Sequence, residues 1–239
     1  MSRKPKKQPR WYFSLRSPYS WFAFEQLRAT DPDLLDAVRW VPTWEPDEVT
    51  AAMLAEAGVE LPYVPMSMDK GRYILQDVRR LAQERGLAMT WPVDREPVWE
   101  VSHLAYLAAE AEGAGREFVA AAYQARWVRG RDISDPAVIA DIAVGLGLDP
   151  VRLSTAWQDG ALRERAMEPL REVWRDGVFG VPFFIVGHQK FWGVDRLPQF
   201  IGAMREHWPA GPSEPEPEPA EDLVVAGVSG DLGHAGGCG

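Results

Sequence analysis

Apolar residues near the N-terminus follow first a strand pattern and then a helix pattern. Residues 11–15 (WYFSL) form a short, mostly apolar run that is typical of a buried strand. The residues that follow repeat large apolar side chains at three-residue intervals, which indicates one buried helix face. Ser17 suits the cap of this helix and Pro18 its first turn. The pattern therefore predicts a strand, a turn and a helix over residues 17–30.

Helical patterns dominate the middle of the chain, after a second expected strand over residues 38–43. Two Asp-Pro pairs, beginning at Asp135 and Asp149, give the cap-then-proline signal of a helix start. Helices are expected over residues 70–85, 97–112, 116–129, 135–146, 150–159 and 161–176.

Strand patterns return near the C-terminus. Residues 183–186 and Phe191-Trp192 are expected to form a hairpin with a turn at residues 187–190, and residues 195–208 to form a closing helix. Strands at both ends of a helical segment predict an α/β fold in which a helical insertion divides one domain. The expected parts are a disordered basic leader (1–10), the divided domain (11–45 and 178–208), the helical insertion (46–177) and a disordered acidic, Pro/Gly-rich tail (209–239).

Charge and cysteine content narrow the possible functions. The net charge of −9 gives no support for a nucleic-acid groove. No apolar run approaches the roughly 20 residues that span a bilayer, and the leader lacks the apolar core of a secretory signal, so we expect a cytoplasmic protein without a membrane partner. The single cysteine, Cys238, lies next to the C-terminus, which excludes dithiol redox chemistry within one chain and a cysteine-based metal site. We expect no metal.

Two short motifs carry the candidate chemistry. Ser17 opens a helix, where unpaired N–H groups and the helix dipole favour a negative charge, so its hydroxyl could donate to a thiolate brought by a cofactor. The alternative is that Ser17 is only a helix cap. Val181-Pro182 precedes an apolar strand, at the place where a thioredoxin-like fold uses a cis-proline beside the first helix, and the alternative there is an ordinary trans-proline. Together the motifs predict a thioredoxin-like active site with serine in place of cysteine.

Four stretches of sequence carry a resemblance to a known family. They are WYFSLRSPYSWFAFEQL, DKGRYILQDVRRLAQERGL followed by WP, RWVRGRDISDP, and FGVPFFIVGHQKFWGVDRL. In this order they resemble 2-hydroxychromene-2-carboxylate isomerase and kappa-class glutathione transferase. The resemblance covers nearly all of residues 11–208 and implies a DsbA-like fold, in which an all-helical domain interrupts a thioredoxin-like domain, and a homodimer. It also implies glutathione or another low-molecular-weight thiol, held as thiolate beside an apolar cleft for a flat organic substrate.

The resemblance implies roles for individual residues. Ser17 corresponds to the thiolate-stabilising serine, and Val181, followed by Pro182, to the backbone that holds the cysteinyl unit of the cofactor. Asp195 and Arg196 correspond to the residues that bind the γ-glutamyl end, where an acid pairs with an ammonium group and an arginine with a carboxylate. Helix capping and a surface salt bridge are the alternative for these two residues.

Other positions match more loosely or depart from the family pattern. Lys70 resembles the basic residue that faces the glycyl carboxylate of the cofactor. Ser14 stands where the family often has Asp, and Val194 where the isomerases tend to have Asn. Arg16 replaces a common apolar residue; it either adds positive potential for a thiolate or acidic substrate or points to solvent. The residues expected to line the substrate pocket are Phe13, Arg16, Tyr19, Trp21, Trp44 and Trp192.

The function that the resemblance implies is isomerisation of a conjugated, unsaturated small molecule through a thiolate cofactor. In the isomerases that the chain resembles, thiolate addition to a conjugated double bond permits rotation about that bond. Three alternatives stay open: a glutathione transferase that releases a conjugate, a thiol-independent isomerase, and a non-catalytic binding protein that keeps the fold. His103 is expected to be a packed or surface histidine rather than a base.

Overall fold

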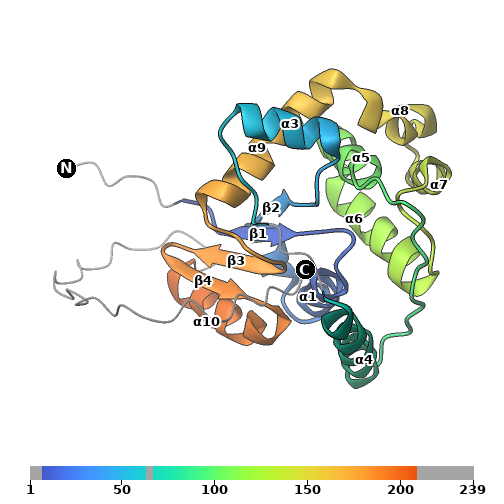
Figure 1. Cartoon of the computed structure of the whole chain (residues 1–239). Helices are drawn as coiled ribbons and strands as arrows, with labels where there is room; N and C mark the ends of the chain where they lie inside the picture. The colour runs from blue at the N-terminus through green and yellow to red at the C-terminus, as the bar shows by residue number, and fades with distance from the viewer. Residues whose placement is uncertain (1–6, 63–66, 209–239) are drawn as a thin grey trace, which may run out of the picture.

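A four-stranded sheet joins the two ends of the chain (Figure 1). The computed structural model describes residues 7–62 and 67–208. The strand order is β2-β1-β3-β4, with β2 parallel to β1 and with β3 antiparallel to both β1 and β4. The strands are β1 (Arg10–Phe13), β2 (Arg39–Pro42), β3 (Phe183–Val186) and β4 (Gln189–Trp192).

Helices follow or connect the strands. In the thioredoxin-like part these are α1 (Pro18–Thr30), α2 (Pro32–Ala37), the 3₁₀ turn Val194–Arg196 and α10 (Leu197–His207). Between β2 and β3 lie only helices and loops among the described residues. These helices are α3 (Glu48–Glu56), α4 (Met68–Glu84), α5 (Glu100–Ala111), α6 (Gly115–Tyr123), the π-helix Gln124–Val128, α7 (Pro136–Leu146), α8 (Pro150–Ser154), the 3₁₀ turn Ala156–Gln158 and α9 (Gly160–Arg175).

The two faces of the sheet bury different side chains. On one face Trp11 lies against Phe184, with ring centroids 6.2 Å apart, and Phe184 stacks at 4.3 Å on Phe200 of α10. On the other face Tyr12 belongs to a separate apolar cluster with Val173 of α9. Helix α9 and helix α10 therefore cover opposite faces (Figure 1), as expected when successive strand residues point to opposite sides.

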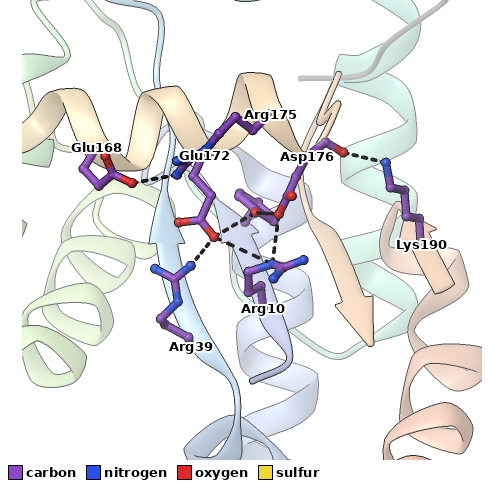
Figure 2. A network of polar contacts seen from close by, with 8 residues as sticks. Arg10, Arg39, Glu168, Glu172, Arg175, Asp176 and Lys190 are labelled. Atoms are coloured by element: carbon purple, nitrogen blue, oxygen red, sulfur yellow. Dashed lines mark hydrogen bonds and ion pairs between the residues drawn. The ribbon is translucent and has the colours of Figure 1, made fainter. Parts of the chain in front are cut away.

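A polar cluster fixes α9 on its face of the sheet (Figure 2). Arg10 Nε lies 3.0 Å from Asp176 Oδ2, and Arg39 forms an ion pair with Glu172. The Tyr12 hydroxyl donates to Glu172 at 3.3 Å and also to Asp176. Burial, together with the bond to Asp176 and the charge of Glu172, raises the pKa of Tyr12, which keeps its hydroxyl protonated as a donor. Two strands and one helix are thereby joined through paired charges.

The expected fold is confirmed, with local differences. The structure contains two helices, α2 and α3, that the sequence patterns did not predict. Helix α3 has a side-chain cap, because Asp47 accepts a hydrogen bond from Thr50 N at 2.8 Å. Strand β4 begins at Gln189, earlier than expected, because the chain reverses within a tighter turn in which Gly187 has φ +58°. The helix expected over residues 116–129 changes to π geometry after Tyr123, and the one over residues 150–159 breaks after Ser154.

The expected leader and tail fall largely outside the described residues. The parts that lie outside are residues 1–6 of the expected leader and the whole expected tail, residues 209–239, which includes Cys238. Arg10, the last residue of the expected leader, is the first residue of β1. In the part of the chain that is described, every helix is too short or too polar to cross a membrane.

Candidate active site

Ser17 caps the N-terminus of α1. Its backbone is extended (φ −88°, ψ 120°), and its Oγ accepts a hydrogen bond from the Ser20 amide at 3.2 Å. The Ser17 amide in turn donates to the Ser14 carbonyl at 3.1 Å. Because Oγ accepts the capping bond through a lone pair, the hydroxyl hydrogen can still be donated to a ligand. Capping and thiolate stabilisation are therefore compatible roles for this serine.

The Ser17 site is enclosed. The residue is only 1% exposed, so a ligand that contacts Oγ must displace part of what covers it. Hydrogen bonds and helix-dipole interactions are stronger in such an environment than in water. A negative sulfur bound at this helix N-terminus would meet a positive potential with little solvent screening.

The Val181-Pro182 peptide bond is cis, as expected. Tyr12 pairs with Phe183 in the antiparallel β1–β3 ladder. Continuing this register by two residues places Val181 opposite Ser14, beside the turn that leads into α1. The Pro182 carbonyl accepts from the Gly193 amide at 2.9 Å, which ties the same loop to the segment before α10. The sheet thus brings the two predicted motifs to the same end of its two central strands.

Asp195 and Arg196 lie in the 3₁₀ turn that contacts α1. Arg196 Nη1 is 2.8 Å from Asp195 Oδ2, and the side chains of Arg196 and Asp195 are 54% and 68% exposed. Gly193 before them has φ +95°, and a Cβ there would lie 2.6 Å from Asp195 Oδ1, so glycine is required. The two charges form a surface salt bridge, which was the alternative stated for these residues. Binding of a γ-glutamyl group stays a prediction.

Lys70 lies near the start of α4, a helix that contacts α1. Its amide donates to Ser67 Oγ at 3.2 Å, which caps α4, and the residue is partly exposed. Helix α4 also approaches the site through Tyr19, whose hydroxyl donates to Asp77 at 2.9 Å. The expected contact of Lys70 with a cofactor carboxylate stays a prediction.

Most of the aromatic residues expected in the pocket are packed in the core. Phe13 is fully buried, and Trp21 stacks on Trp127 with centroids 6.2 Å apart. Trp44 is buried and stacks on the His103 ring at 5.0 Å. In this conformation these side chains present almost no surface to a ligand. Their role in lining a pocket stays a prediction.

Two of the expected pocket residues are more exposed. Trp192 is half-buried and makes an edge contact with Phe179 at 4.9 Å. Arg16 forms an ion pair with Glu45 at 2.8 Å, with its guanidinium 5.3 Å from the Trp99 ring centroid. A side-chain exposure of 30% leaves Arg16 accessible from solvent. Arg16 is the charged residue among the expected pocket residues, and it directly precedes Ser17 in the sequence.

His103 of α5 contacts the turn before Ser17, a contact that the sequence patterns did not predict. The residue is fully buried, and its Nε2 lies 3.2 Å from the Leu15 amide. Burial lowers the pKa of His103 to about 3, with the charges of Arg16 and Arg126 adding to the effect. The ring is neutral at ordinary pH, in agreement with a packed histidine rather than a base.

Glu100 is a second buried group near the site that the sequence did not reveal. Its Oε1 accepts from Trp44 Nε1 at 3.1 Å and from the Asp47 amide at 2.8 Å. Burial raises the pKa of this carboxyl against the effect of these bonds. An acidic residue at the start of a helix gives no sequence signal of such burial. Among the described residues, no group of His, Cys, Asp or Glu side chains is arranged to hold a metal ion.

The fold is shared with several known proteins. A 2-hydroxychromene-2-carboxylate isomerase from Sphingobium xenophagum is 29% identical over 187 residues, which is 78% of this chain and 92% of that protein. The solved structure of a 2-hydroxychromene-2-carboxylate isomerase superposes with a TM-score of 0.65 at 24% identity, covering 83% of this chain and 94% of the other. The cytosolic disulfide reductase DsbM from Pseudomonas aeruginosa, solved with GSH, gives 0.53 at 18% identity over 83% and 98% of the two chains.

These comparisons confirm the expected resemblance and the expected enzyme class, an isomerase. Residues 10–205 match the family described as "DSBA-like thioredoxin domain". This match spans both halves of the sheet, the helical insertion, and both motifs of the site. The chain therefore belongs to the DSBA-like thioredoxin domain family.

Proposed function

We propose that this chain isomerises a conjugated, unsaturated small molecule with the help of a low-molecular-weight thiol held as thiolate at Ser17. The observation that carries the proposal is the position of the Ser17 hydroxyl at the N-terminus of α1, at the same end of the sheet as cis Val181-Pro182. The thiol we propose is glutathione, a low-molecular-weight thiol that cells contain. The structurally similar DsbM was solved with GSH, which supports that choice.

The residues of the site suit a bound thiol. When bound, the thiolate supplies a nucleophile whose reversible addition makes a conjugated double bond rotatable. The Ser17 hydroxyl donates a hydrogen bond that lowers the free energy of negative sulfur, and the N-terminus of α1 adds its dipole. Val181 offers backbone groups to a peptide-like cofactor, and Asp195 and Arg196 offer opposite charges to its amino and carboxylate ends. We also propose that the chain acts in the cytoplasm, where the pool of low-molecular-weight thiols is reduced.

The substrate proposed here carries a carboxylate. Arg16 directly precedes Ser17, is accessible from solvent, and is held over the Trp99 ring. Its partner Glu45 is 37% exposed, so a substrate carboxylate could replace that ion pair at little cost. The similar isomerases are named for a substrate with a carboxylate group, which supports this class.

The test is thiol-dependent turnover of conjugated carboxylates by Ser17→Ala, with Ser17→Thr as the control that keeps the hydroxyl. We expect Ser17→Ala to lower turnover by roughly a hundredfold, the usual effect of removing one preorganised donor. Ser17→Thr should retain most of it. Turnover by Ser17→Ala that equals the wild-type value would contradict the role of Ser17. Full turnover in thiol-free buffer would instead indicate a thiol-independent isomerase.

The mass of the product separates isomerisation from transfer. An isomerase leaves the mass of its substrate unchanged, whereas a transferase adds the mass of the thiol. We expect a product of unchanged mass, with the thiol recovered. A stable conjugate would identify the chain as a transferase with the same site.

We also infer that the chain acts as a homodimer, which the family resemblance implies.

A further inference from the structure

A single peptide group just before Ser17 is held from two helices of the insertion. This group consists of the Ser14 carbonyl and the Leu15 amide. The Leu15 N–H donates to His103 Nε2 of α5 at 3.2 Å, and the Ser14 carbonyl accepts from the Tyr123 hydroxyl of α6 at 3.2 Å. Both ends of one peptide plane are therefore bound by side chains that are distant in sequence.

We propose that His103 and Tyr123 are positioning residues, which set the orientation of the Ser14–Leu15 peptide and, through it, the place of Ser17. The inference rests on the proposed function for its catalytic consequence. The link to Ser17 is direct, because the same Ser14 carbonyl also accepts from the Ser17 amide at 3.1 Å. Rotation of this peptide plane would break the bond and move the first turn of α1.

The hydrogen-bond partners of His103 determine its tautomer. The Leu15 amide can only donate, so Nε2 must be the unprotonated nitrogen. The Trp99 carbonyl can only accept, and it lies 2.8 Å from Nδ1, so Nδ1 must carry the proton. The low pKa of His103 agrees with this neutral form. The two nitrogens thus have different roles, since Nδ1 anchors the ring to α5 and Nε2 holds the turn.

The His103 ring has little freedom to turn away. It is fully buried and stacks on Trp44 at an interplanar angle of 24°. Ser14 Oγ lies 3.4 Å from Nε2, the nitrogen that also binds the Leu15 amide. Tyr123 is also fully buried, so water has no access to the side chain of either residue. A rigid contact of this kind is what a catalytic group needs from its surroundings.

The two nitrogens can be tested separately with His103→Gln and His103→Asn in the full chain. The amide of Gln reaches the position of Nε2 and can accept from Leu15, whereas the shorter Asn reaches only the position of Nδ1. Hydrogen exchange of the Leu15 amide, followed by NMR, reports the bond itself. Thiol-dependent turnover with a conjugated carboxylate reports its consequence for Ser17.

We expect His103→Asn to raise the Leu15 exchange rate by about tenfold or more, since a buried amide loses its partner. Its turnover number should fall by a similar factor, while KM for the substrate changes little. His103→Gln should keep both values within about threefold of the wild type. Tyr123→Phe should behave as His103→Asn does in turnover, because it removes the side-chain hydrogen bond at the other end of the same peptide.

The inference is overturned if Leu15 stays equally protected in His103→Asn, or if Gln and Asn lose protection and turnover alike. The exchange measurement does not depend on activity. If the wild-type chain turns over no conjugated carboxylate, the proposed function fails, yet the exchange rates of the two variants still decide whether His103 holds the turn. Equal midpoints of thermal unfolding in the two variants exclude a general loss of stability as the cause.

Discussion

The hydroxyl of Ser17 has different atoms for its capping bond and for a ligand. Its oxygen accepts the capping bond from Ser20, and its hydrogen is left for a ligand. A cysteine at this position would carry the negative charge itself, whereas serine can only stabilise a charge that arrives with a cofactor. At the residue scale, serine in place of cysteine makes this position suited to binding a thiolate rather than to redox exchange.

His103 makes stability depend on pH. Its pKa in the folded protein is about 3, below the ordinary value of 6.5 that it regains on unfolding. Between these values the unfolded chain binds a proton that the folded chain does not, so the free energy of unfolding falls as the pH falls from about 6.5 toward 3. The slope from this residue reaches about 1.4 kcal/mol per pH unit.

Urea unfolding between about pH 7 and pH 4.5 measures this contribution. We expect the wild type to lose more stability over that range than His103→Gln, which cannot be protonated. His188→Gln, in the exposed β3–β4 turn, is the control and should follow the wild type. Parallel curves for wild type and His103→Gln would show that His103 is not the group responsible.

Among the elements, the π-helix after α6 holds a buried cation in place. It carries Arg126, whose side chain is 5% exposed and binds both oxygens of Asp94 at 2.7 and 2.8 Å. The guanidinium also lies 5.0 Å from the Trp99 ring centroid and 4.8 Å from that of Trp127. This cation therefore ties the long segment before α5 to the π-helix that follows α6.

Removal of the Asp94 carboxylate should be costly. Asp94→Ala leaves Arg126 buried without its counter-charge, and we expect a loss of about 3 kcal/mol in the free energy of unfolding. Asp141→Ala removes a carboxylate from an ion pair with Arg131, in which the side chains of Asp141 and Arg131 are 65% and 34% exposed, and should cost less than about 1 kcal/mol. Chemical denaturation of both variants gives the comparison. Equal losses would mean that burial of Arg126 does not matter.

Sequence patterns predicted the helices and strands that have clear local signals. They missed the features that depend on contacts between distant segments. The Asp-Pro starts located α7 and α8 correctly. No local pattern indicated the π geometry after Tyr123, where Arg126 and Trp127 contact the distant residues Asp94 and Trp21. His103 was expected to be packed, but its partner, the Leu15 amide, lies in a distant segment that periodicity cannot identify.

At the scale of the whole molecule, the sheet is what assembles the site. Strands from the two ends of the chain lie side by side, so the turn into α1 meets the loop that holds cis Val181-Pro182 (Figure 1). The sequence predicted this meeting because both motifs flank predicted strands. It did not distinguish pocket aromatics from core aromatics, since Phe13 and Trp21 have the same side-chain chemistry in either place.

The proposed homodimer is a prediction at this scale. Sedimentation equilibrium of the full chain should give twice the mass of one chain, independent of added glutathione. The mass of a single chain over the micromolar range would contradict it, without bearing on the Ser17 site.

Stabilisation of a thiolate by the N-terminus of α1 is central to the proposed function and can be measured without a substrate. The protein for this is Ser17→Cys in a Cys238→Ser background, with the pKa of the introduced thiol followed by thiolate absorbance. The same protein unfolded in guanidinium chloride gives the reference, close to about 8.5 for a free cysteine. We predict a pKa at least about one unit lower in the folded state, because the helix N-terminus outweighs burial. A folded-state pKa at or above the unfolded value would contradict this claim.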